Sequence, residues 1–248
     1  MASGLPRLYR DLADWWPLLS APAGYRGEAE SCRQTLLAAC VAPPRTLLEL
    51  GSGGGNTASH LKRDFRLTLV DAAPRMLAVS RRANPECEHV LGDMRHVRLG
   101  RVFDAVFIHD AIMYMTTERD LLRAMTTAFA HCRAGGAVVI APDNVRDHFA
   151  ARTWHGGHDG AGRALRYLEW TWDPDPRDQS YVVDMVYLLR DRGGRMRVVR
   201  DRHVYGLFPV RTWRALLRRA GFLPRVVTDR WNREVFVGRK PAPRRRPR

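Results

Sequence analysis

The feature that most constrains this chain is an apolar run that ends directly in a glycine-rich turn. Residues 47–50 are Leu-Leu-Glu-Leu, and residues 51–55 are Gly-Ser-Gly-Gly-Gly, followed by Asn56. Glycines at such a strand-to-helix turn let a bound ligand approach the backbone where a Cβ would collide. The turn predicts an open α/β sheet with a binding crevice, but nicotinamide and flavin proteins use the same arrangement.

Short apolar runs and amphipathic segments alternate between Pro44 and Pro142, as expected for a parallel α/β sheet. The predicted strands are at residues 46–50, 67–70, 89–91, 102–108 and 137–141. The predicted helices begin near Asn56, Ala73 and Thr117, and a further helix at 210–220 precedes a terminal hairpin at 226–228 and 235–238. The predicted fold class is therefore α/β and Rossmann-like, a mostly parallel seven-stranded sheet with helices on both faces.

Two further regions lie outside this series. Residues 1–42 place apolar residues at helical spacing and predict two helices that form an N-terminal lid. Residues 146–206 predict a loop to about Gly162 and then an antiparallel meander, with strands at 165–172, 181–189 and 196–205. Because insertions at the carboxyl ends of parallel strands tend to cover the site there, we expect the meander to roof the active site.

One domain at residues 43–238 is predicted between the lid and a basic tail at 239–248. The tail holds five arginines, one lysine and three prolines, and it is predicted to be disordered. The four cysteines are isolated, and the N-terminus lacks a basic segment followed by an apolar one. We therefore expect a cytoplasmic protein without a membrane partner, and a homodimer stays open.

Acidic residues follow the next two predicted strands at the same edge of the sheet. Asp71 lies twenty residues after Gly51, where a carboxylate can accept both hydroxyls of an adenosine ribose. At the end of the third strand, Asp93 can accept the adenine amino group and Met94 can lie against the ring. The acidic Glu49 before the glycines suits a ligand that has no pyrophosphate to hold.

In order and spacing, residues 46–141 resemble the class I S-adenosylmethionine-dependent methyltransferases. The resemblance rests on the E-x-G-x-G-x-G turn, the acid after strand two, the Gly-Asp pair after strand three, and Phe-Asp-Ala-Val at the start of strand four. It implies a methyltransferase whose donor is S-adenosylmethionine and whose product is S-adenosylhomocysteine. The donor-binding residues that it implies are Tyr9, Tyr25, Glu49, Gly51, Ser52, Gly53, Asp71, Ala72, Met76, Gly92, Asp93, Met94 and His109. Tyr9 and Tyr25 would belong to an aromatic lid, whose rings stabilise a sulfonium cation.

The predicted meander makes the layout similar to that of sugar N-methyltransferases. This similarity implies a small-molecule acceptor, such as an amino sugar or a secondary metabolite, methylated on nitrogen or oxygen. A neutral amine needs little beyond alignment, whereas a hydroxyl needs a base, and the candidate bases are His109, His155 and His158. Further acceptor-side candidates are Tyr167, Trp170, Trp172, His203 and Tyr205. For His109 and the two tryptophans, a structural role in the pocket wall or in packing is the alternative.

Two other substrate classes stay open. The net charge of +15 raises the possibility of an RNA or protein methyltransferase, but only two of the 41 basic residues are lysines and the arginines are scattered. Nucleic acid is therefore not the expected partner. Asp110, with Asp143 and Asn144, is similar to the magnesium ligands of catechol-type O-methyltransferases, although a long meander is foreign to that fold and no metal is expected. A domain that only binds a partner is disfavoured because every donor position is occupied.

Overall fold

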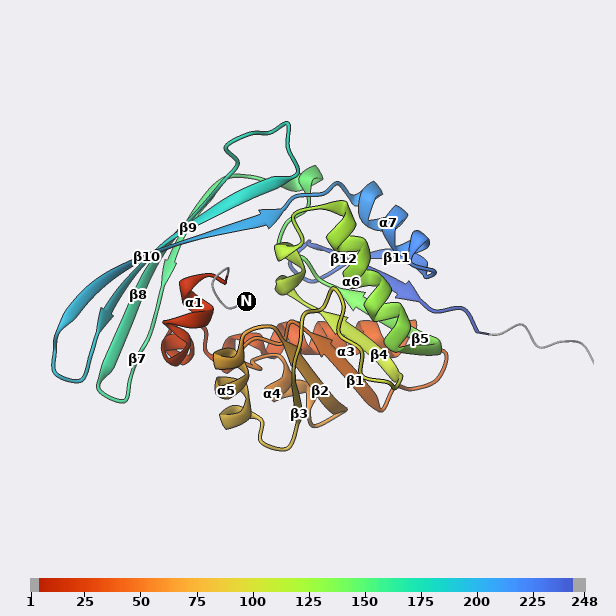
Figure 1. Cartoon of the computed structure of the whole chain (residues 1–248), viewed down its shortest axis with the longest axis horizontal. Coiled ribbons are helices and arrows are strands. Elements are labelled where there is room, and N and C mark those ends of the chain that lie inside the picture. The colour runs from red at the N-terminus through yellow and green to blue at the C-terminus, as the bar shows by residue number, and fades with distance from the viewer. Residues whose placement is uncertain (1–4, 243–248) are drawn as a thin grey trace, which may run out of the picture.

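The computed structural model describes residues 5–242 and contains two β-sheets with an N-terminal helical segment between them (Figure 1). Sheet A has seven strands in the order β11-β12-β5-β4-β1-β2-β3. Strands β1 to β5 are parallel, whereas β12 runs antiparallel to both β5 and β11. The strands are β1 (Thr46–Leu50), β2 (Arg66–Asp71), β3 (Glu88–Leu91), β4 (Phe103–Ile108), β5 (Cys132–Ile140), β11 (Leu223–Thr228) and β12 (Glu234–Arg239). This architecture confirms the predicted mostly parallel seven-stranded sheet.

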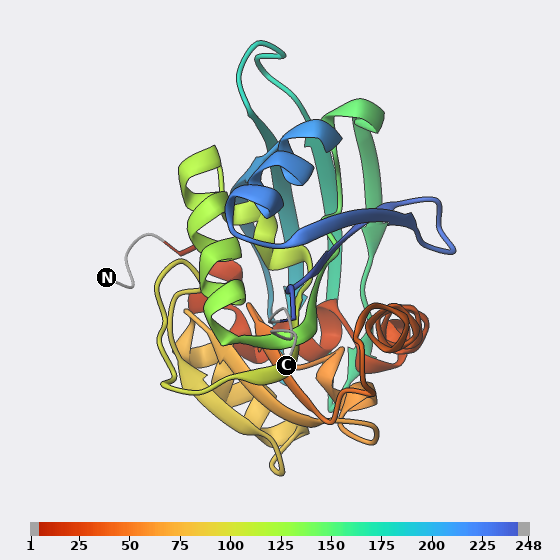
Figure 2. The same ribbon diagram turned by 90° about the vertical axis from the view of Figure 1, so that its right-hand side faces the viewer.

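Helices cover both faces of sheet A because its strands are apolar on both sides. In β1, Leu48 and Leu50 belong to one buried cluster, whereas Leu47 belongs to another. The first cluster includes buried residues of α6 (Glu118–His131) and α7 (Val210–Arg219), and the second includes those of α3 (Arg26–Ala39) and α4 (Ala58–Leu61). Figure 2 shows α6 and α7 packed side by side. Helix α5 (Pro74–Ala83) contacts β2 and β3. The parallel strands are thus buried on both faces, as this sheet type requires.

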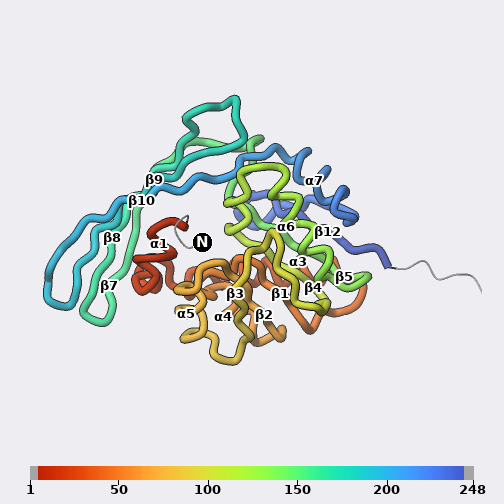
Figure 3. Tube along the Cα trace, viewed as in Figure 1, coloured from red at the N-terminus to blue at the C-terminus, as the bar shows by residue number. Residues whose placement is uncertain are grey.

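Sheet B is antiparallel and stands beyond the carboxyl ends of the sheet A strands (Figure 3). Its strands are β6 (Arg152–Gly156), β7 (Asp159–Gly160), β8 (Arg163–Trp172), β9 (Ser180–Arg190) and β10 (Met196–Gly206). The last three are the predicted meander. The predicted loop at 146–162 is wrong in part, because residues 152–156 pair with β8 and form a strand. This segment lacks apolar alternation, so its strand depends on the partner that β8 offers.

Of the two helices predicted in residues 1–42, the second is present as α3 (Arg26–Ala39), whereas the first is wrong, because residues 7–25 are broken into short turns. The turns are α1 (Arg7–Arg10), η2 (Ala13–Trp15), α2 (Trp16–Leu19) and η3 (Pro22–Tyr25), after which α3 follows as a long helix. Pro17 and Pro22 each lie in the first turn of a new element, because proline has no N–H to continue the previous one. Leu8, Leu12 and Leu18 pack in the same buried cluster as side chains of both sheets. This short-turn segment therefore fills the space between the sheets.

The described residues continue past β12 into the start of the predicted basic tail. Arg239 ends β12, and the backbone of Lys240 is hydrogen-bonded to Gly135 and Gly136. The rest of the predicted tail, residues 243–248, lies outside the described residues. Among residues 5–242, no helix combines the length and the apolar character that a membrane crossing would need.

Candidate active site

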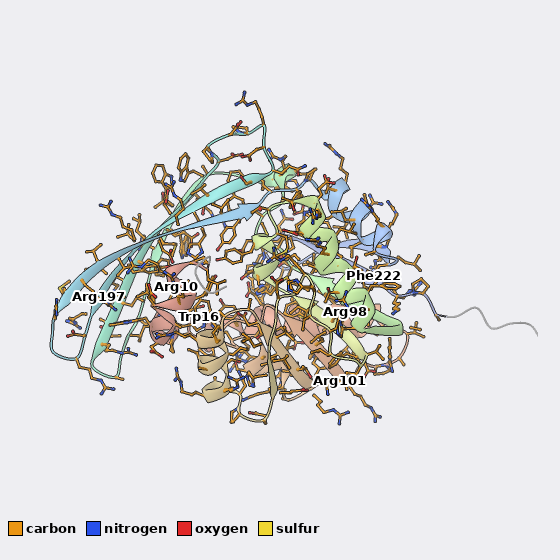
Figure 4. The ribbon with its side chains drawn as sticks, viewed as in Figure 1. Arg10, Trp16, Arg98, Arg101, Arg197 and Phe222 are labelled. Carbon is orange, nitrogen blue, oxygen red and sulfur yellow. The ribbon has the colours of Figure 1, made fainter. Side chains whose placement is uncertain are left out.

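One continuous cavity of about 560 Å³ lies between the carboxyl ends of the sheet A strands and the inner face of sheet B. Its floor comes from the turn after β1 and the ends of β2, β3 and β4, and its roof comes from β8, β9 and β10. The short-turn segment closes one side, where the Trp16 indole N–H donates to the Asn56 side chain at 3.4 Å (Figure 4). All predicted donor residues except Met76 line this cavity. Met76 is fully buried beneath the turn, packed with Ala73 and Val79.

The glycine-rich turn follows β1 in a conformation that side chains rarely adopt. Gly51 and Gly53 have φ angles of 78° and 52°. A Cβ on Gly51 would lie 2.4 Å from the Ala111 Cβ, whereas a Cβ on Gly53 would meet only Met76, at 3.9 Å. Gly51 is therefore required by packing, and Gly53 leaves its side of the turn open to a ligand. The turn thus leaves space at Gly53, and donor binding there stays a prediction.

Asp71 faces the glycine turn from the end of β2. One carboxylate oxygen accepts a hydrogen bond from the Gly53 N–H at 2.7 Å, and the other accepts one from the Ala73 N–H at 2.8 Å. Burial raises the pKa of Asp71, against the effect of these backbone donors. Each oxygen has a second lone pair, so the carboxylate can still accept from a ligand hydroxyl.

Asp93 follows β3 at the edge of the cavity and is held by Arg95. The Arg95 Nε donates to both carboxylate oxygens at 3.0 Å, and its Nη1 reaches Asp120 at 3.2 Å. Burial acts to raise the pKa of Asp93, but the hydrogen bonds from Arg95 outweigh it and the pKa is lowered. An ionised acceptor is therefore kept where the sequence predicts the adenine amino group, with Met94 beside it in the lining.

Glu49 is a buried carboxyl without a complete set of partners. Its side chain is 2% exposed, it lines the cavity, and its Oε2 has no hydrogen-bond partner among the described residues. Burial, followed by the charge of Asp71, raises the pKa of Glu49 to about 8. The Ser52 hydroxyl, in the same lining, is also unpartnered. Buried polar atoms in this state indicate a ligand that completes their hydrogen bonds.

His109 is placed in the wall between β4 and α3. Its ring stacks on Phe107 at 5.7 Å, and its Nε2 lies 3.1 Å from Asp110 and 3.6 Å from Glu28. Burial lowers the pKa of His109, against the effect of the nearby carboxylates. It lines the cavity, as predicted, but this packed position also fits the structural alternative.

Asp110 and Asp143 meet in the cavity, but their surroundings do not favour magnesium. Burial raises the pKa of Asp110 well above its usual range, and Asp143 adds to this by charge and by a hydrogen bond. The Asn144 amide oxygen accepts a hydrogen bond from Arg152 at 3.2 Å, so a cation already occupies its acceptor. Among residues 5–242, no cluster of three or more acidic, histidine or cysteine side chains could hold a metal ion.

The structure does not bring His155 and His158 to the cavity. His155 is exposed on β6, and His158 is exposed where its backbone N–H and ring Nδ1 contact the Leu18 carbonyl, at 3.0 and 3.2 Å. Tyr167 lines the cavity, whereas Trp170 and Trp172 stack on each other at 5.4 Å and are absent from the lining. A role for either histidine as the base stays a prediction without geometric support.

A hydrogen-bonded group centred on Tyr114 was not predicted from the sequence. The Tyr114 hydroxyl lies 2.6 Å from His203 Nδ1, 3.0 Å from the Tyr9 hydroxyl and 3.1 Å from the Tyr205 hydroxyl. His203 and Tyr205 were acceptor-side candidates, but Tyr114 follows β4 in a segment without a motif. Tyr187 was also missed, although its fully buried, unpartnered hydroxyl belongs to the lining. Its place on β9 six positions after Tyr181, on the same face of the strand, was the available signal.

Part of the chain is similar to known methyltransferases. Residues 47–136 match the family described as "Methyltransferase domain". The dTDP-3-amino-3,4,6-trideoxy-α-D-glucopyranose N,N-dimethyltransferase of Streptomyces venezuelae is 32% identical over 99 residues, which are 39% of this chain and 42% of that protein. The sequence match therefore spans about two fifths of the curated relative.

Two solved structures resemble nearly the whole chain. Streptomyces venezuelae DesVI has a TM-score of 0.84 at 25% identity, covering 94% of this chain and 99% of that one. The sugar N-methyltransferase KedS8 from Streptoalloteichus sp. ATCC 53650 has a TM-score of 0.80 at 27% identity, covering 96% and 95%. These matches confirm the predicted resemblance to class I methyltransferases of the sugar N-methyltransferase type, the predicted fold, and methyltransferase as the class of enzyme.

Proposed function

We propose that this methyltransferase-type chain transfers a methyl group from S-adenosylmethionine to an amine of a small molecule, with an amino sugar as the favoured acceptor. The observation that carries the proposal is the continuity of the cavity. The glycine turn and the carboxylates of Asp71 and Asp93 open into the same cavity as the tyrosines and Glu169 of sheet B. Donor and acceptor therefore have room to meet in one cavity.

The donor side of the cavity fits each part of S-adenosylmethionine. Asp71 has lone pairs for the ribose hydroxyls, and ionised Asp93 can accept from the adenine amino group. Glu49 offers a buried, unpartnered carboxyl oxygen to a cation such as the donor's amino group. Tyr9 and Tyr25 bring aromatic faces to a sulfonium. When bound, the donor supplies a methyl group on positively charged sulfur, which an amine lone pair displaces.

The acceptor side of the cavity is lined mainly by carboxylates and tyrosines. Asp110, Asp143 and Glu169 face it, whereas Arg152 is the basic residue among the lining residues of this side. Such a lining offers hydrogen-bond acceptors to an amine and little positive charge to a phosphate-rich polymer. The names of the curated relative and of KedS8, which state N-methylation of amino sugars and of sugars, agree with this choice.

The chain's own contribution to the reaction is alignment and exclusion of water. The strand ends of sheet A fix the donor residues, and the inner face of sheet B and the short-turn segment close over them. Because the leaving group is already activated by its charge, holding nucleophile, methyl and sulfur in line accounts for much of the rate. Histidine-assisted deprotonation is then needed only where the acceptor arrives protonated.

The proposal is tested by a methyl-transfer assay with three acceptors: a dTDP-3-amino sugar, catechol and transfer RNA. Methylation of the amino sugar that is unaffected by a chelator is the expected result. Methylation of catechol that is abolished by the chelator would identify the metal-dependent alternative, and methylation of RNA would identify the polymer class. Absence of S-adenosylhomocysteine binding by calorimetry would overturn the donor assignment and revive a role limited to partner binding.

A further inference from the structure

The Tyr114-centred hydrogen-bonded group connects three parts of the chain at the junction of donor and acceptor sides. Tyr114 ends η4 (Asp110–Tyr114), His203 and Tyr205 lie on β10, and Tyr9 belongs to α1. Tyr9 lies close enough to Asp71 and Asp110 for their charges, after burial, to raise its pKa. The group is therefore placed between the donor carboxylate and the roof.

The histidine of this group is backed by a carboxylate. His203 is 2% exposed, and its Nε2, which makes no hydrogen bond to the described residues, lies at an ion-pair distance of 3.5 Å from Asp201 Oδ2. The same carboxylate oxygen accepts a hydrogen bond from the Leu8 N–H at 2.7 Å. Burial acts to raise the pKa of Asp201, but the nearby His203 side chain and the hydrogen bond from the Leu8 backbone lower it. Asp201 therefore stays ionised and can stabilise a positive charge on the imidazole.

An amine acceptor requires a group of this kind. An alkyl amine, with a pKa of about 10 like that of lysine, arrives largely as an ammonium ion at neutral pH and must lose a proton before its lone pair can attack. His109 lies against Asp110 and Glu28, and its pKa is lowered by burial. His155 and His158 do not line the cavity. His203 also lines the cavity, and its Nδ1 is hydrogen-bonded to the Tyr114 hydroxyl.

We propose that Tyr114, His203 and Asp201 form the proton-accepting relay of the methyl-transfer reaction. The Tyr114 hydroxyl, which can donate to Tyr9, turns its proton to His203 Nδ1 in the reacting complex. The ammonium N–H bond breaks as a bond forms to the Tyr114 oxygen, and the original Tyr114 O–H bond breaks as a bond forms to His203 Nδ1. The amine keeps its electron pair for the methyl group, and the imidazolium is stabilised by Asp201. The relay rests on the proposed function. Tyr114 is the catalytic residue, and His203 and Asp201 are positioning residues that act through Tyr114.

The phenol is suited to pass a proton on rather than to hold a negative charge. Burial raises the pKa of Tyr114 well above its usual range, and Tyr205 and Tyr9 add to this effect. A phenolate is therefore disfavoured, so proton gain and proton loss at this oxygen must be concerted. The titratable groups that face His203 from the surrounding elements are Asp201, Tyr205, Tyr114, Tyr9 and Glu169.

Variants of Tyr114 and His203 test the relay in single-turnover assays with a dTDP-3-amino sugar. We expect Tyr114→Phe and His203→Gln to slow methyl transfer about 100-fold at pH 7 while leaving S-adenosylhomocysteine affinity unchanged. The deficit should shrink as the pH rises toward 9.5, because more of the amine then arrives neutral. A purely structural role would give a deficit that does not change with pH, and this result would overturn the relay.

His131→Gln is the matched control. His131 is also 2% exposed and hydrogen-bonded through both ring nitrogens, but it lies in α6 and outside the cavity lining. Its replacement should lower stability without changing the shape of the pH profile. A wild-type chain that methylates no amine would contradict the proposed function, whereas an active wild type whose variants keep its pH profile would contradict the relay alone.

A nitrogen-15 spectrum of the histidines tests the relay without any acceptor. The proposal requires that His203 carries its proton on Nε2, toward Asp201, and that Nδ1 accepts from Tyr114. The Nδ1 resonance should then shift in Tyr114→Phe and stay unchanged in His131→Gln. A proton resident on Nδ1 in the donor-bound wild type would overturn the proposal, because this nitrogen could not then accept another.

Discussion

The donor side of the cavity is built from the ends of parallel strands, whereas the acceptor side is built from side chains along the middle of antiparallel strands. On the donor side, Asp71 and Gly53 are fixed by main-chain hydrogen bonds at the edge of sheet A. On the acceptor side, His203 and Tyr187 are placed by their register on the inner face of sheet B. The donor-side arrangement follows from the order of the strands in the chain. The acceptor-side arrangement depends on which face of sheet B becomes buried.

The most severe test of the donor side is Asp71→Ala. The substitution removes the acceptor for the ribose hydroxyls. It also leaves the N–H groups of Gly53 and Ala73 without the charged oxygens to which they donate in the wild type. Hydrogen bonds to charged groups contribute about 1.5–3 kcal/mol each, so we expect calorimetry to show a loss of S-adenosylhomocysteine affinity of at least about 100-fold.

Asp64→Ala is the control for that variant. Asp64 forms an ion pair with Arg63 and does not line the cavity, so its replacement should leave donor affinity within twofold. A circular dichroism spectrum should show that both variants keep the fold. Unchanged affinity in Asp71→Ala would refute the donor site and with it the contrast between the two sides.

The donor side could be predicted from the sequence because chain order determines where each strand ends. Once Leu47–Leu50 is a strand of a parallel sheet, Gly51 and Asp71 must lie at the same edge, as they do. The antiparallel insertion was predicted from three runs with strand alternation and turn residues. The strand at Arg152–Gly156 was missed because its own sequence lacks alternation, and pairing with β8 creates it.

The acceptor side was harder to predict because alternation does not tell which face is inside. Tyr167 and Trp170 lie on the same strand at odd and even positions, so they face opposite sides, and only Tyr167 lines the cavity. The glycine-flanked His155 and His158 stood out in the sequence, yet both are exposed. Tyr114 had no motif, since its role depends on β10 approaching η4 from far along the chain. Tertiary packing determines which of these side chains reach the cavity.

The pH dependence of donor binding tests Glu49, the buried carboxyl of the donor side. Its pKa of about 8 keeps this carboxyl mainly neutral at pH 7 in the free protein. The stability that the folded protein gains from the neutral carboxyl is lost as the pH rises through 8. If a donor cation pairs with the carboxylate, binding must release this proton. Affinity should therefore rise at least about tenfold between pH 6 and pH 8.

Calorimetry in two buffers of different ionisation enthalpy would count the protons released at pH 7. We expect close to one for the wild type and none for Glu49→Gln, whose affinity should lose its pH dependence. Glu30→Gln is the control, because Glu30 pairs with Arg33 on α3, away from the cavity. Equal proton release in Glu49→Gln would show that another group titrates.

Tyr187→Phe tests the acceptor side without disturbing the relay. Its hydroxyl is buried and unpartnered, which costs stability unless a ligand uses it. We expect KM for the amine acceptor to rise about tenfold, the value of one hydrogen bond of about 1.4 kcal/mol, while donor affinity stays the same. The free energy of unfolding should be unchanged or slightly higher.

Trp170→Phe, on the same sheet but outside the cavity lining, is the control for acceptor binding and should leave KM unchanged. If Tyr187→Phe instead lowers stability and leaves KM as it was, the hydroxyl has a structural partner. The acceptor would then lie nearer to the Tyr114-centred group than to β9, and the roof would contribute fewer binding groups than its lining indicates.

The smallest effect is expected for His155→Ala and His158→Ala, the two candidate bases that the structure leaves outside the cavity. Both side chains are exposed, and the backbone N–H of His158 keeps its bond to Leu18 when the ring is removed. Single-turnover rates should therefore stay within about twofold, and stability should fall by about 1 kcal/mol at most in His158→Ala. A tenfold slower rate in either variant would place the base in the β6–β8 segment. His203→Gln is measured in the same assay. The two sets of rates therefore distinguish a base at His155 or His158, which stand out in the local sequence, from a base at His203, which is positioned by the register of sheet B.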